Sequence, residues 1–399
     1  MNFFKRIWCR LYQFVFRIIS PFLPYREPQL LKNNKHLAEQ IKQEGVESVL
    51  IVTTASMIKY GLINSLQLEL EKMGVKWHIY SETVPNPTTN NVAAALEIYN
   101  SNNCQAIIAF GGGSAMDCAK AVGAKVVKPK KSLKQMKGLL KVNKKLPPLF
   151  AIPTTAGTGS ETTVAAVITD AETRHKYAIN DFNLIPHYAL LDASLTLTLP
   201  PNITSTTGMD ALTHAIEAYI GQSATKKTKK YALEAVKMII ENIEKAYNNG
   251  EDIVARENML KASYLAGMAF TRSYVGYVHA VSHSLSGKYN TAHGLANAVL
   301  LPVVLKKYGK RVYKKLWELG VYANLFKKDV NISEGAELFI QKLEQMNKNM
   351  NIPKYLTEIK ALDIPELAKT AEKEANPLYP VPVLYSAEEL EDIYHSVMK

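Results

Sequence analysis

Short apolar runs alternate with helix-like stretches between residues 46 and 200. Buried strands are predicted at residues 48–53, 77–80, 105–110, 149–152 and 164–169. A helix is predicted after the first strand, running to about Met73 and ending at Gly74, and another over 91–99. This alternation predicts an α/β domain whose mainly parallel sheet has helices on both faces.

Beyond Pro200-Pro201 the pattern changes to helices alone. Helical periodicity covers 204–219, 228–247, 253–271 and 333–346, and Ser333 is the predicted N-cap of the last. The double proline is the best candidate domain boundary, because proline interrupts helices and restricts the residue before it. The predicted fold is therefore an α/β domain over 26–200 followed by an all-α domain over 201–399.

Residues 1–25 form a different kind of segment, an amphipathic basic helix. Its charges are Lys5, Arg6, Arg10 and Arg17, and no acid precedes Glu27. A secretory signal is not expected, because arginines interrupt the apolar stretch and no small-residue cleavage site follows. Two interpretations remain open: the helix lies on a membrane surface, or it packs its apolar face on its own body or on a partner subunit. The apolar positions at helical spacing are Phe3, Phe4, Ile7, Trp8, Leu11, Phe14, Val15, Ile18 and Ile19.

Composition and charge narrow the class of protein. With 47% hydrophobic and 21% charged residues, the chain resembles an ordinary soluble globular protein of two or three domains. Its three cysteines share no metal-type spacing and favour a reducing, cytoplasmic setting. The net charge of +12 is partly local, in 125–145 and 226–230. No nucleic-acid-binding module accompanies these lysines, so solvated faces are expected and no nucleic-acid partner.

The helical half contains a candidate metal site. Asp210 and His214 are four residues apart, so both side chains leave one face of a helix. His279 and His283 repeat that spacing, and His293 follows. Chance also produces such pairs among nine histidines. One carboxylate with three imidazoles suits a catalytic Fe²⁺ or Zn²⁺ that keeps an open position.

Two polar loops follow strands of the predicted sheet. Gly111-Gly112-Gly113-Ser114 comes after strand 105–110 and begins a helix, so backbone amides are free for a phosphate. The stretch 153–161 follows the next strand with several hydroxyls and two glycines. Neither loop is a G-x-G-x-x-G fingerprint or a P-loop. Two such loops at the ends of strands of one sheet predict a nucleotide cleft at a switch point.

Four long motifs, in this order, resemble the iron-containing (group III) alcohol dehydrogenase family. They are GGGSAMDCAK at 111–120, AIPTTAGTGSE at 151–161, TGMDALTHAIEAY at 207–219 and HAVSHSLSGKYNTAHGLANAVLLP at 279–302. The resemblance runs from about Pro28 to the C-terminus and leaves the N-terminal helix outside. It implies a dinucleotide-binding domain (26–200), a helical metal and catalytic domain (201–399) and a metal between them.

The resemblance also implies roles for individual residues. The metal ligands would be Asp210, His214, His279 and His293. His283 matches a histidine near the nicotinamide; it would relay the hydroxyl proton or only line the pocket. Asp117 would orient cofactor or substrate, or only favour the helix start through the dipole. The implied cofactor contacts are Asn86, Gly112, Gly113, Ser114, Asp117, Thr154, Thr155, Thr158 and Lys176.

Departures from the family pattern bear on the cofactor. Many members have an acid after the first strand that binds the adenosine ribose, whereas this chain has Thr53-Thr54. Without that carboxylate a 2′-phosphate is not repelled, so NADP is predicted in preference to NAD, with Thr54 as a contact. Ala115 and Ala292 replace prolines that are usual in the family, and the turn before His293 is expected to be less rigid.

The predicted function is a metal-dependent, NAD(P)-linked alcohol dehydrogenase or aldehyde reductase that acts as a homodimer. The metal would polarise the substrate oxygen while hydride passes to or from the nicotinamide. Aromatic candidates for the pocket are Phe182, Tyr274 and Tyr277. The alternatives are a glycerol- or hydroxy-acid-dehydrogenase-like enzyme of the same superfamily, and a non-catalytic membrane-surface protein on this fold.

Overall fold

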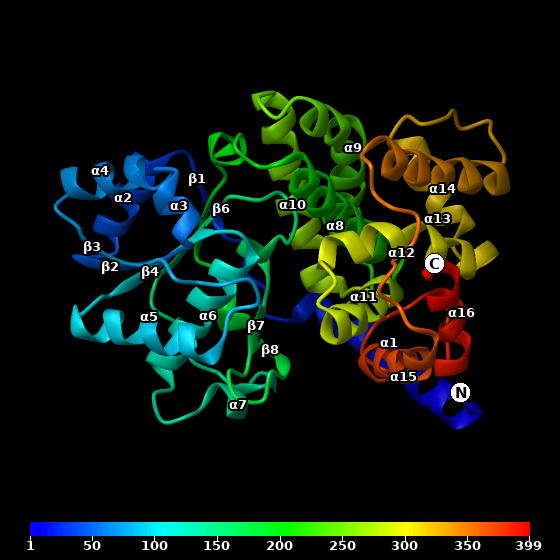
Figure 1. Cartoon of the computed structure of the whole chain (residues 1–399), viewed down its shortest axis with the longest axis horizontal. Coiled ribbons are helices and arrows are strands. Elements are labelled where there is room, and N and C mark those ends of the chain that lie inside the picture. Colours follow the sequence, from blue (N-terminus) through cyan, green and yellow to red (C-terminus); the bar gives the residue numbers. More distant parts are fainter. The chain divides into compact units, whose positions relative to one another are not determined.

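The computed structural model describes residues 1–399, which divide into two compact units (Figure 1). The sheet unit comprises Pro24–Thr196, and the helical unit comprises Met1–Leu23 together with Leu197–Lys399. The N-terminal segment, predicted as a helix distinct from both domains, is grouped with the C-terminal half. None of the helices is both long and apolar enough to cross a membrane.

The sheet unit is built on six parallel strands in the order β1-β9-β6-β4-β2-β3. The predicted α/β fold with a mainly parallel sheet is confirmed. Because the chain passes from β2 outward to β3 and then returns to β4 on the other side of β2, the sheet has a switch point between β2 and β4. The strands are β1 (Gln29–Leu31), β2 (Ser48–Val52), β3 (Lys76–Tyr80), β4 (Ala106–Gly111), β6 (Leu149–Pro153) and β9 (Tyr188–Leu190).

Helices cover both faces of this sheet, with α2 and α4 on one side and α5 and α6 on the other (Figure 1). Strand β2 is buried throughout because it packs against both layers. Val49 and Ile51 belong to the core beneath α2 and α4, whereas Leu50 and Val52 belong to the core beneath α5 and α6. The helices are α2 (Asn34–Gln43), α3 (Ala55–Lys59), α4 (Asn64–Lys72), α5 (Thr89–Ser101), α6 (Gly113–Val127) and α7 (Leu133–Met136).

Some elements differ from the prediction. Strand β7 (Ala165–Thr169) does not join the parallel sheet: it pairs antiparallel with β8 (Lys176–Asn180), which also pairs with β5 (Gly138–Leu139). Sequence patterns did not reveal β1, β5, β8 or β9, because two to five residues give little periodicity. The helix predicted to run to Met73 is two helices, since Gly61 adopts a φ of +65° between α3 and α4.

The helical unit packs α8, α9 and α10 side by side, with the remaining helices around them (Figure 1). Gly208 allows the close approach, since a Cβ there would lie 2.6 Å from Ile243 and 2.8 Å from Met259. The predicted N-cap at Ser333 is wrong: Asn331 caps α14 and accepts from the amide of Glu334 at 2.9 Å. The helices are α1 (Phe3–Ile19), α8 (Pro201–Ile220), α9 (Lys226–Asn248), α10 (Ile253–Ser273), α11 (Tyr277–Tyr289), α12 (His293–Tyr308), α13 (Tyr313–Tyr322), α14 (Ile332–Asn349), α15 (Ile364–Ala375) and α16 (Ala387–Val397).

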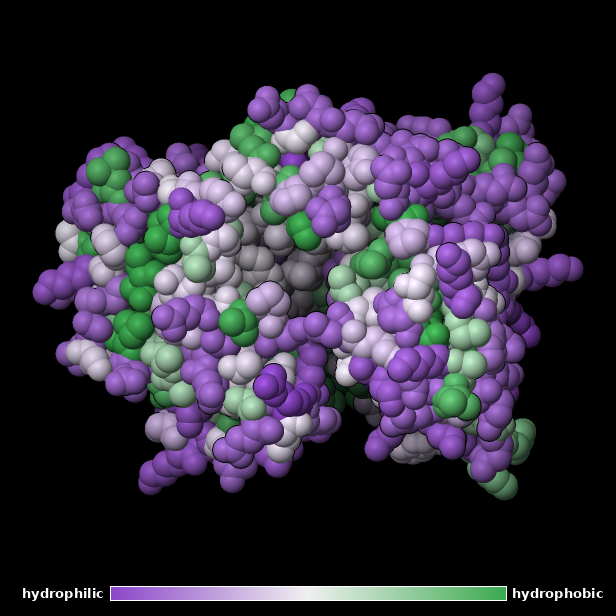
Figure 2. All heavy atoms as spheres, in the orientation of Figure 1, coloured by the Kyte–Doolittle hydropathy of each residue, from purple (hydrophilic) through white to green (hydrophobic).

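Helix α1 lies beside α15 and α16 at the blue end of the chain (Figure 1). Lys5 pairs with Glu372 of α15 at 2.6 Å, and Arg6 pairs with Glu389 of α16 at 3.3 Å. Figure 2 shows a mostly hydrophilic surface on the viewed face, with apolar side chains projecting at the N-terminal end of the chain. Most apolar side chains of α1 are exposed, whereas Phe16 packs on Tyr274.

Candidate metal centre and cofactor loops

Three helices of the helical unit bring the predicted ligands together. Helix α8 contributes Asp210 and His214, α11 contributes His279, and α12 begins at His293. The Nε2 atoms of His279 and His293 lie 3.7 and 3.4 Å from Oδ1 of Asp210. One ligand atom each of Asp210, His279 and His293 lies within 4.8 Å of the other two. His279 and His293, which follow Asp210 by 69 and 83 positions in the sequence, thus face its carboxylate.

The amide of Asn297 shows that this centre fits a cation. Its Nδ2 lies 2.7 Å from Oδ1 of Asp210, 3.3 Å from Nε2 of His279 and 3.1 Å from Nε2 of His293. Once Nε2 of His279 gives up its proton, three acceptors face this one amide nitrogen, and its two hydrogens cannot satisfy all of them at once. The Oδ1 of Asn297 is buried without a partner. The lone pairs of three ligands therefore converge on a point that a divalent metal would fill more completely.

His214 lies at the edge of this group. Its Nε2 is 4.0 Å from Oδ1 of Asp210, and its ring stacks on His279 at 4.5 Å and on Phe270 at 4.0 Å. The stacking holds the imidazole on the face of α8 that Asp210 also occupies. His214 therefore lies near the same carboxylate, but outside the group of three ligand atoms that lie within 4.8 Å of one another.

Local backbone features bring α12 close to α8. A Cβ at Gly294 would lie 2.4 Å from the carbonyl oxygen of Thr206, so glycine is needed directly after His293. Ala292 has a φ of −59°, within the range that proline would impose. The turn before His293 therefore keeps the backbone that the missing proline would favour. Ser282 contacts Nδ1 of His293 at 3.2 Å and helps to orient the ring.

Glu217 orients His279 from the opposite side. Its buried carboxylate accepts from Nδ1 of His279 at 2.6 Å, and from the backbone amides of Gly276 at 2.7 Å and Val278 at 2.8 Å. The contact with Nδ1 directs Nε2 of His279 toward Asp210, the arrangement seen for metal-bound histidines. Gly276 makes room for this carboxylate, because a Cβ there would lie 2.6 Å from Oε1 of Glu217.

The charges of the centre shift the pKa values of its members. Burial alone would lower the pKa of His279, but the carboxylates of Asp210 and Glu217 raise it to about 9. Burial lowers the pKa of His293 well below its usual value. For Asp210 burial acts upward, yet the neighbouring imidazoles hold the pKa far below its usual range. Without metal His279 thus holds a proton that metal binding would displace, because a ligand imidazole must be neutral.

His283 follows His279 by one turn of α11 and has its own carboxylate partner. Its Nδ1 lies 2.6 Å from Oε1 of Glu374, which also accepts from the hydroxyl of Tyr379 at 2.7 Å. Burial would raise the pKa of Glu374, but His283 and the hydrogen bonds lower it, so the carboxylate stays ionised. The His283 ring stacks on that of His293 at 5.0 Å and is partly open to solvent.

The predicted phosphate loops meet within the sheet unit. Gly111 of β4 pairs with Pro153 of β6, so the loops that follow these strands lie side by side. A Cβ at Gly112 would lie 3.3 Å from Oγ1 of Thr155, and one at Gly113 would lie 2.9 Å from Cγ2 of Thr158. A Cβ at Gly113 would therefore force Thr158 to shift, and one at Gly112 would be tight against Thr155. Gly112 is the N-cap of α6 and makes no side-chain bond, which leaves the first amides of that helix, including Ser114, available to an anion.

Three ionisable side chains, those of Lys120, Asp117 and Glu161, lie at the second loop, which spans residues 153–161. Nζ of Lys120 donates to Oγ1 and O of Thr163 at 2.8 and 2.9 Å, and burial lowers its pKa to about 8. Asp117 accepts from Ser160 at 3.2 Å, and burial raises its pKa to about 6. Glu161 is buried, and its pKa is raised to about 7 for the same reason. Asp117 therefore ties the start of α6 to the second loop, a positioning role beside the predicted cofactor role.

Other predicted cofactor residues lie at the same end of the parallel sheet. Nζ of Lys176 donates to Oδ1 of Asn86 at 2.8 Å, so the two predicted contacts are neighbours. The amide of Thr154 donates to the carbonyl oxygen of Gly111 at 3.1 Å. Thr54 follows β2, at the switch point, and its hydroxyl lies 2.9 Å from that of Ser56. Thr54, Asn86 and Thr154 belong to loops that follow strands of the parallel sheet, where open α/β sheets bind ligands, whereas Lys176 is the first residue of β8 in the smaller sheet.

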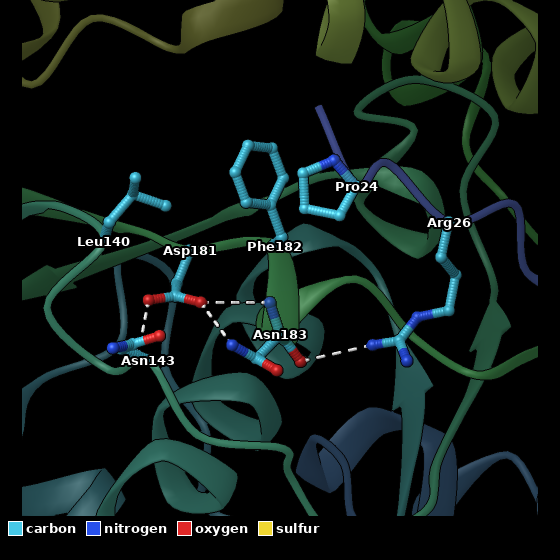
Figure 3. Close-up of a pocket in the computed structure, with 7 residues that line it drawn as sticks. All are labelled: Pro24, Arg26, Leu140, Asn143, Asp181, Phe182 and Asn183. Carbon is cyan, nitrogen blue, oxygen red and sulfur yellow. Dashed lines mark hydrogen bonds between the residues drawn. The ribbon is translucent and has the colours of Figure 1, made fainter. Parts of the chain in front are cut away.

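The predicted pocket aromatics have different surroundings. Phe182 lines a hollow of about 390 Å³ with Pro24, Arg26 and Asp181, and none of the predicted cofactor residues borders it (Figure 3). Tyr277 is fully buried and donates to Asn376 at 3.0 Å, so it is a core residue. Tyr274 ends α10 and packs on Phe16 of α1 at 4.9 Å. The aromatic prediction therefore does not describe one shared pocket.

Sequence reasoning missed four residues of these sites. Glu217 is seven positions after Asp210 and three after His214, and Asn297 is four after His293. Both spacings lie on the ligand-bearing helix faces, so a search for polar residues at i+3, i+4 and i+7 would have found them. Glu374 and Lys120 show no such signal, because their hydrogen-bond partners are 91 and 43 residues away in the sequence.

Comparison with known proteins places the chain in a family. The model "Iron-containing alcohol dehydrogenase" matches residues 32–193, and "Fe-containing alcohol dehydrogenase family, C-terminal" matches 204–398. Alcohol dehydrogenase 4 of Schizosaccharomyces pombe is 38% identical, over 90% of this chain and 85% of its own length. The NAD-dependent methanol dehydrogenase of Bacillus methanolicus is 38% identical, over 84% and 89%.

A solved structure agrees with these matches. That of 1,3-propanediol oxidoreductase superposes with a TM-score of 0.89 at 32% identity, covering 93% of this chain and 98% of that one. The resemblance found in the sequence motifs is confirmed, and with it an enzymatic rather than a purely scaffolding role. The chain belongs to the iron-containing alcohol dehydrogenase family and is an alcohol or aldehyde oxidoreductase of the iron type.

Proposed function

We propose that this enzyme interconverts a small alcohol and its aldehyde with one divalent metal, Fe²⁺ or Zn²⁺. The proposed ligands are Asp210, His214, His279 and His293. The observation that supports them most directly is the convergence of three ligand atoms on the amide of Asn297. When bound, the metal supplies Lewis-acid polarisation of the substrate oxygen, and the nicotinamide supplies the hydride chemistry.

The chain's own residues would hold and orient these groups. Glu217 keeps Nε2 of His279 directed to the centre, and Ser282 does the same for His293. In the sheet unit, the amides after Gly112 would bind the pyrophosphate. The proposed further cofactor contacts are Asn86, Gly113, Ser114, Asp117, Thr154, Thr155, Thr158 and Lys176.

His283 is the proposed proton relay. Glu374 contacts its Nδ1, which leaves Nε2 as the atom that exchanges a proton with the substrate hydroxyl, directly or through water. Replacing His283 by Gln is expected to lower kcat by about 10²-fold, a usual size for general acid–base catalysis, with bound metal unchanged. A pH–rate profile measures this, because one limb should vanish in the variant. An unaltered profile would make His283 a pocket-lining residue only.

NADP is the proposed cofactor rather than NAD. Thr54 and Ser56 present hydroxyls where many relatives have an acid, and they lie 2.9 Å apart at the end of β2. The backbone of Thr54 also pairs with that of Glu82, whose side chain is exposed and screened by water. Hydroxyl groups can bind a 2′-phosphate without the repulsion that a carboxylate at position 54 would add.

Replacing Thr54 by Asp is expected to shift preference toward NAD by about tenfold or more, the equivalent of roughly 1.4 kcal/mol. The new carboxylate would accept from the ribose hydroxyls and repel a 2′-phosphate. The measurement is the ratio of kcat/KM for NADH and NADPH. Ser101→Asp, at the exposed end of α5, adds the same charge elsewhere and should leave the ratio unchanged. If the Thr54 variant has the same ratio as the unaltered protein, Thr54 does not contact the cofactor in the proposed way.

Metal removal and reloading test the proposal as a whole. Protein stripped with a chelator and reloaded anaerobically with Fe²⁺ or Zn²⁺ is assayed by NADPH and NADH oxidation against short and medium aldehydes. Turnover should depend on metal and be faster with NADPH. If metal and nucleotide bind but no aldehyde is reduced, the alternative of glycerol or hydroxy-acid chemistry takes precedence, and those substrates are assayed in the oxidative direction.

A further inference from the structure

Helix α1 is attached to the helical unit by its polar side. Gln13, 2% exposed, donates to the carbonyl oxygen of Tyr379 at 2.7 Å. Arg10 donates to the carbonyl oxygens of Val381 and Pro382 at 2.8 and 3.0 Å. At the end of the helix, the hydroxyl of Ser20 donates to a backbone carbonyl of α10 at 2.9 Å. The helix is thus held in one orientation by hydrogen bonds from polar side chains.

The opposite side of α1 is apolar and faces solvent. Phe4 is 81% exposed, and Phe22, just beyond the helix, is 84% exposed. The stripe repeats every three or four residues over 17 residues, or about 25 Å. We call it the apolar face of α1; its members are Phe3, Phe4, Ile7, Trp8, Leu11, Phe14, Val15, Ile18, Ile19 and Phe22. A continuous apolar surface of this kind marks an interaction site in a folded protein.

This arrangement decides between the interpretations that the sequence left open. The apolar face does not pack on the chain's own body. The first 31 residues also lie outside the family model that begins at residue 32. The helix is therefore an addition to the oxidoreductase fold, and its outward face requires an occupant other than the body of this chain.

Positive charge accompanies the C-terminal end of the apolar face. Arg17 and Lys229 both act electrostatically on Lys315, which places the three charges near one another, with Glu318 beside them. Lys315 itself donates to the carbonyl oxygen of Ile220 at 2.6 Å. Helix α9 begins with lysines at 226, 227, 229 and 230 and has no acid in its first turn. Cations at a helix N-terminus oppose its dipole, so this cluster does not serve the stability of α9. At the other end, Lys5 and Arg6 are balanced by glutamates.

These observations favour one occupant. Lys5 and Arg6 are balanced by glutamates, but a second copy packed through this face would bring the positive charges of Arg17 and the start of α9 together at its C-terminal end. An anionic bilayer complements both features, because acyl chains accept the apolar stripe and headgroups attract the basic residues. We propose that α1 docks this enzyme onto an anionic phospholipid surface, with its apolar face at the headgroup boundary and Arg17 and the lysines at the start of α9 against the headgroups.

Vesicle sedimentation of the full-length protein tests the proposal. Binding is expected to vesicles of phosphatidylglycerol mixed with phosphatidylcholine, with much weaker binding to phosphatidylcholine alone and loss in high salt. The double variant Trp8→Ser, Phe14→Ser should bind at least about tenfold more weakly, because it removes two large apolar groups from the contact. The matched control is Leu362→Ser, at a residue 96% exposed outside α1, and it should bind as the unaltered protein does.

Two charge-reversal variants test whether basic residues attract the enzyme to anionic headgroups. Arg17→Glu should weaken binding to the anionic vesicles by at least about tenfold, because it replaces attraction by repulsion. Lys328→Glu, an exposed lysine between α13 and α14, makes the same change elsewhere and should have little effect. All of these positions are on the surface, so thermal unfolding and aldehyde reduction in solution should be unchanged. Activity therefore reports on the proposed function separately from membrane binding.

Two results would overturn the proposal. One is vesicle binding that is absent, or equal in the double variant and the unaltered protein. The other is a dimer in solution, measured by light scattering, that separates in the double variant while no vesicles are bound. That second result would assign the apolar face of α1 to a contact between copies of this chain.

Discussion

Replacing His279 by Ala is expected to abolish metal retention and turnover together. The imidazole is buried, its Nε2 lies 3.7 Å from Oδ1 of Asp210, and Glu217 directs it there. Lewis-acid stabilisation of the transition state is worth several kcal/mol. At 1.4 kcal/mol for each tenfold, its loss lowers kcat/KM on the order of a thousandfold. Metal content per chain and kcat/KM for aldehyde reduction are the measurements.

The control and a second variant separate this effect from misfolding. His395→Ala removes an exposed histidine of α16 and should change neither quantity. Loss of His279 also leaves two buried carboxylates without a shared partner, so the variant should unfold at a lower temperature. His293→Ala affects a less buried ring and should lose metal with a smaller effect on stability. A metal-loaded, active His279 variant would reject the ligand assignment.

Replacing Glu217 by Gln is expected to weaken metal binding by about 10–100-fold, the usual effect of removing a carboxylate that orients a metal-bound histidine. The carboxylate accepts three hydrogen bonds, from Nδ1 of His279 and from the amides of Gly276 and Val278. Glutamine has the same shape, but its amide nitrogen cannot accept, so one of these donors loses its partner. Competition with a chelator of known affinity measures the change.

Glu374→Gln is the matched control for this prediction. Glu374 contacts Nδ1 of His283 at 2.6 Å, the same geometry as the pair of Glu217 and His279. His283 is not a proposed ligand, so metal affinity should not change, whereas the pH profile of turnover should. If both glutamine variants weaken metal binding equally, Glu217 has no special part in orienting His279.

The predicted parallel-sheet and helical parts of the fold agree with the structure because both depend on local patterns. The strands Ser48–Val52 and Ala106–Gly111 are mostly apolar and buried throughout, as expected for strands covered on both faces. The i, i+4 spacing of Asp210 and His214 places both on one face of α8. Strands were predicted less well where they are short, or where strands of different sheets have the same sequence pattern. Strand β7 looks like the others, yet its partner is antiparallel β8.

The N-terminal helix shows a different limit. Its periodicity predicted an amphipathic helix, and α1 is one over Phe3–Ile19. Periodicity cannot say which face meets the body of the protein, and the usual expectation is the apolar one. Here Arg10 and Gln13 find carbonyl oxygens in the segment 379–382. Those acceptors are more than 360 residues away in sequence, so no local pattern could reveal them.

By itself, the sequence determined the types of element, the order of the two halves and the candidate residues for binding metal and cofactor. These depend on spacing along one helix or strand, and spacing is local. Only the tertiary structure decided which atoms meet: the convergence of Asp210, His279 and His293 on Asn297, and the outward direction of the apolar face of α1. Such contacts join residues that are distant in sequence, and the packing of whole helices and loops determines them.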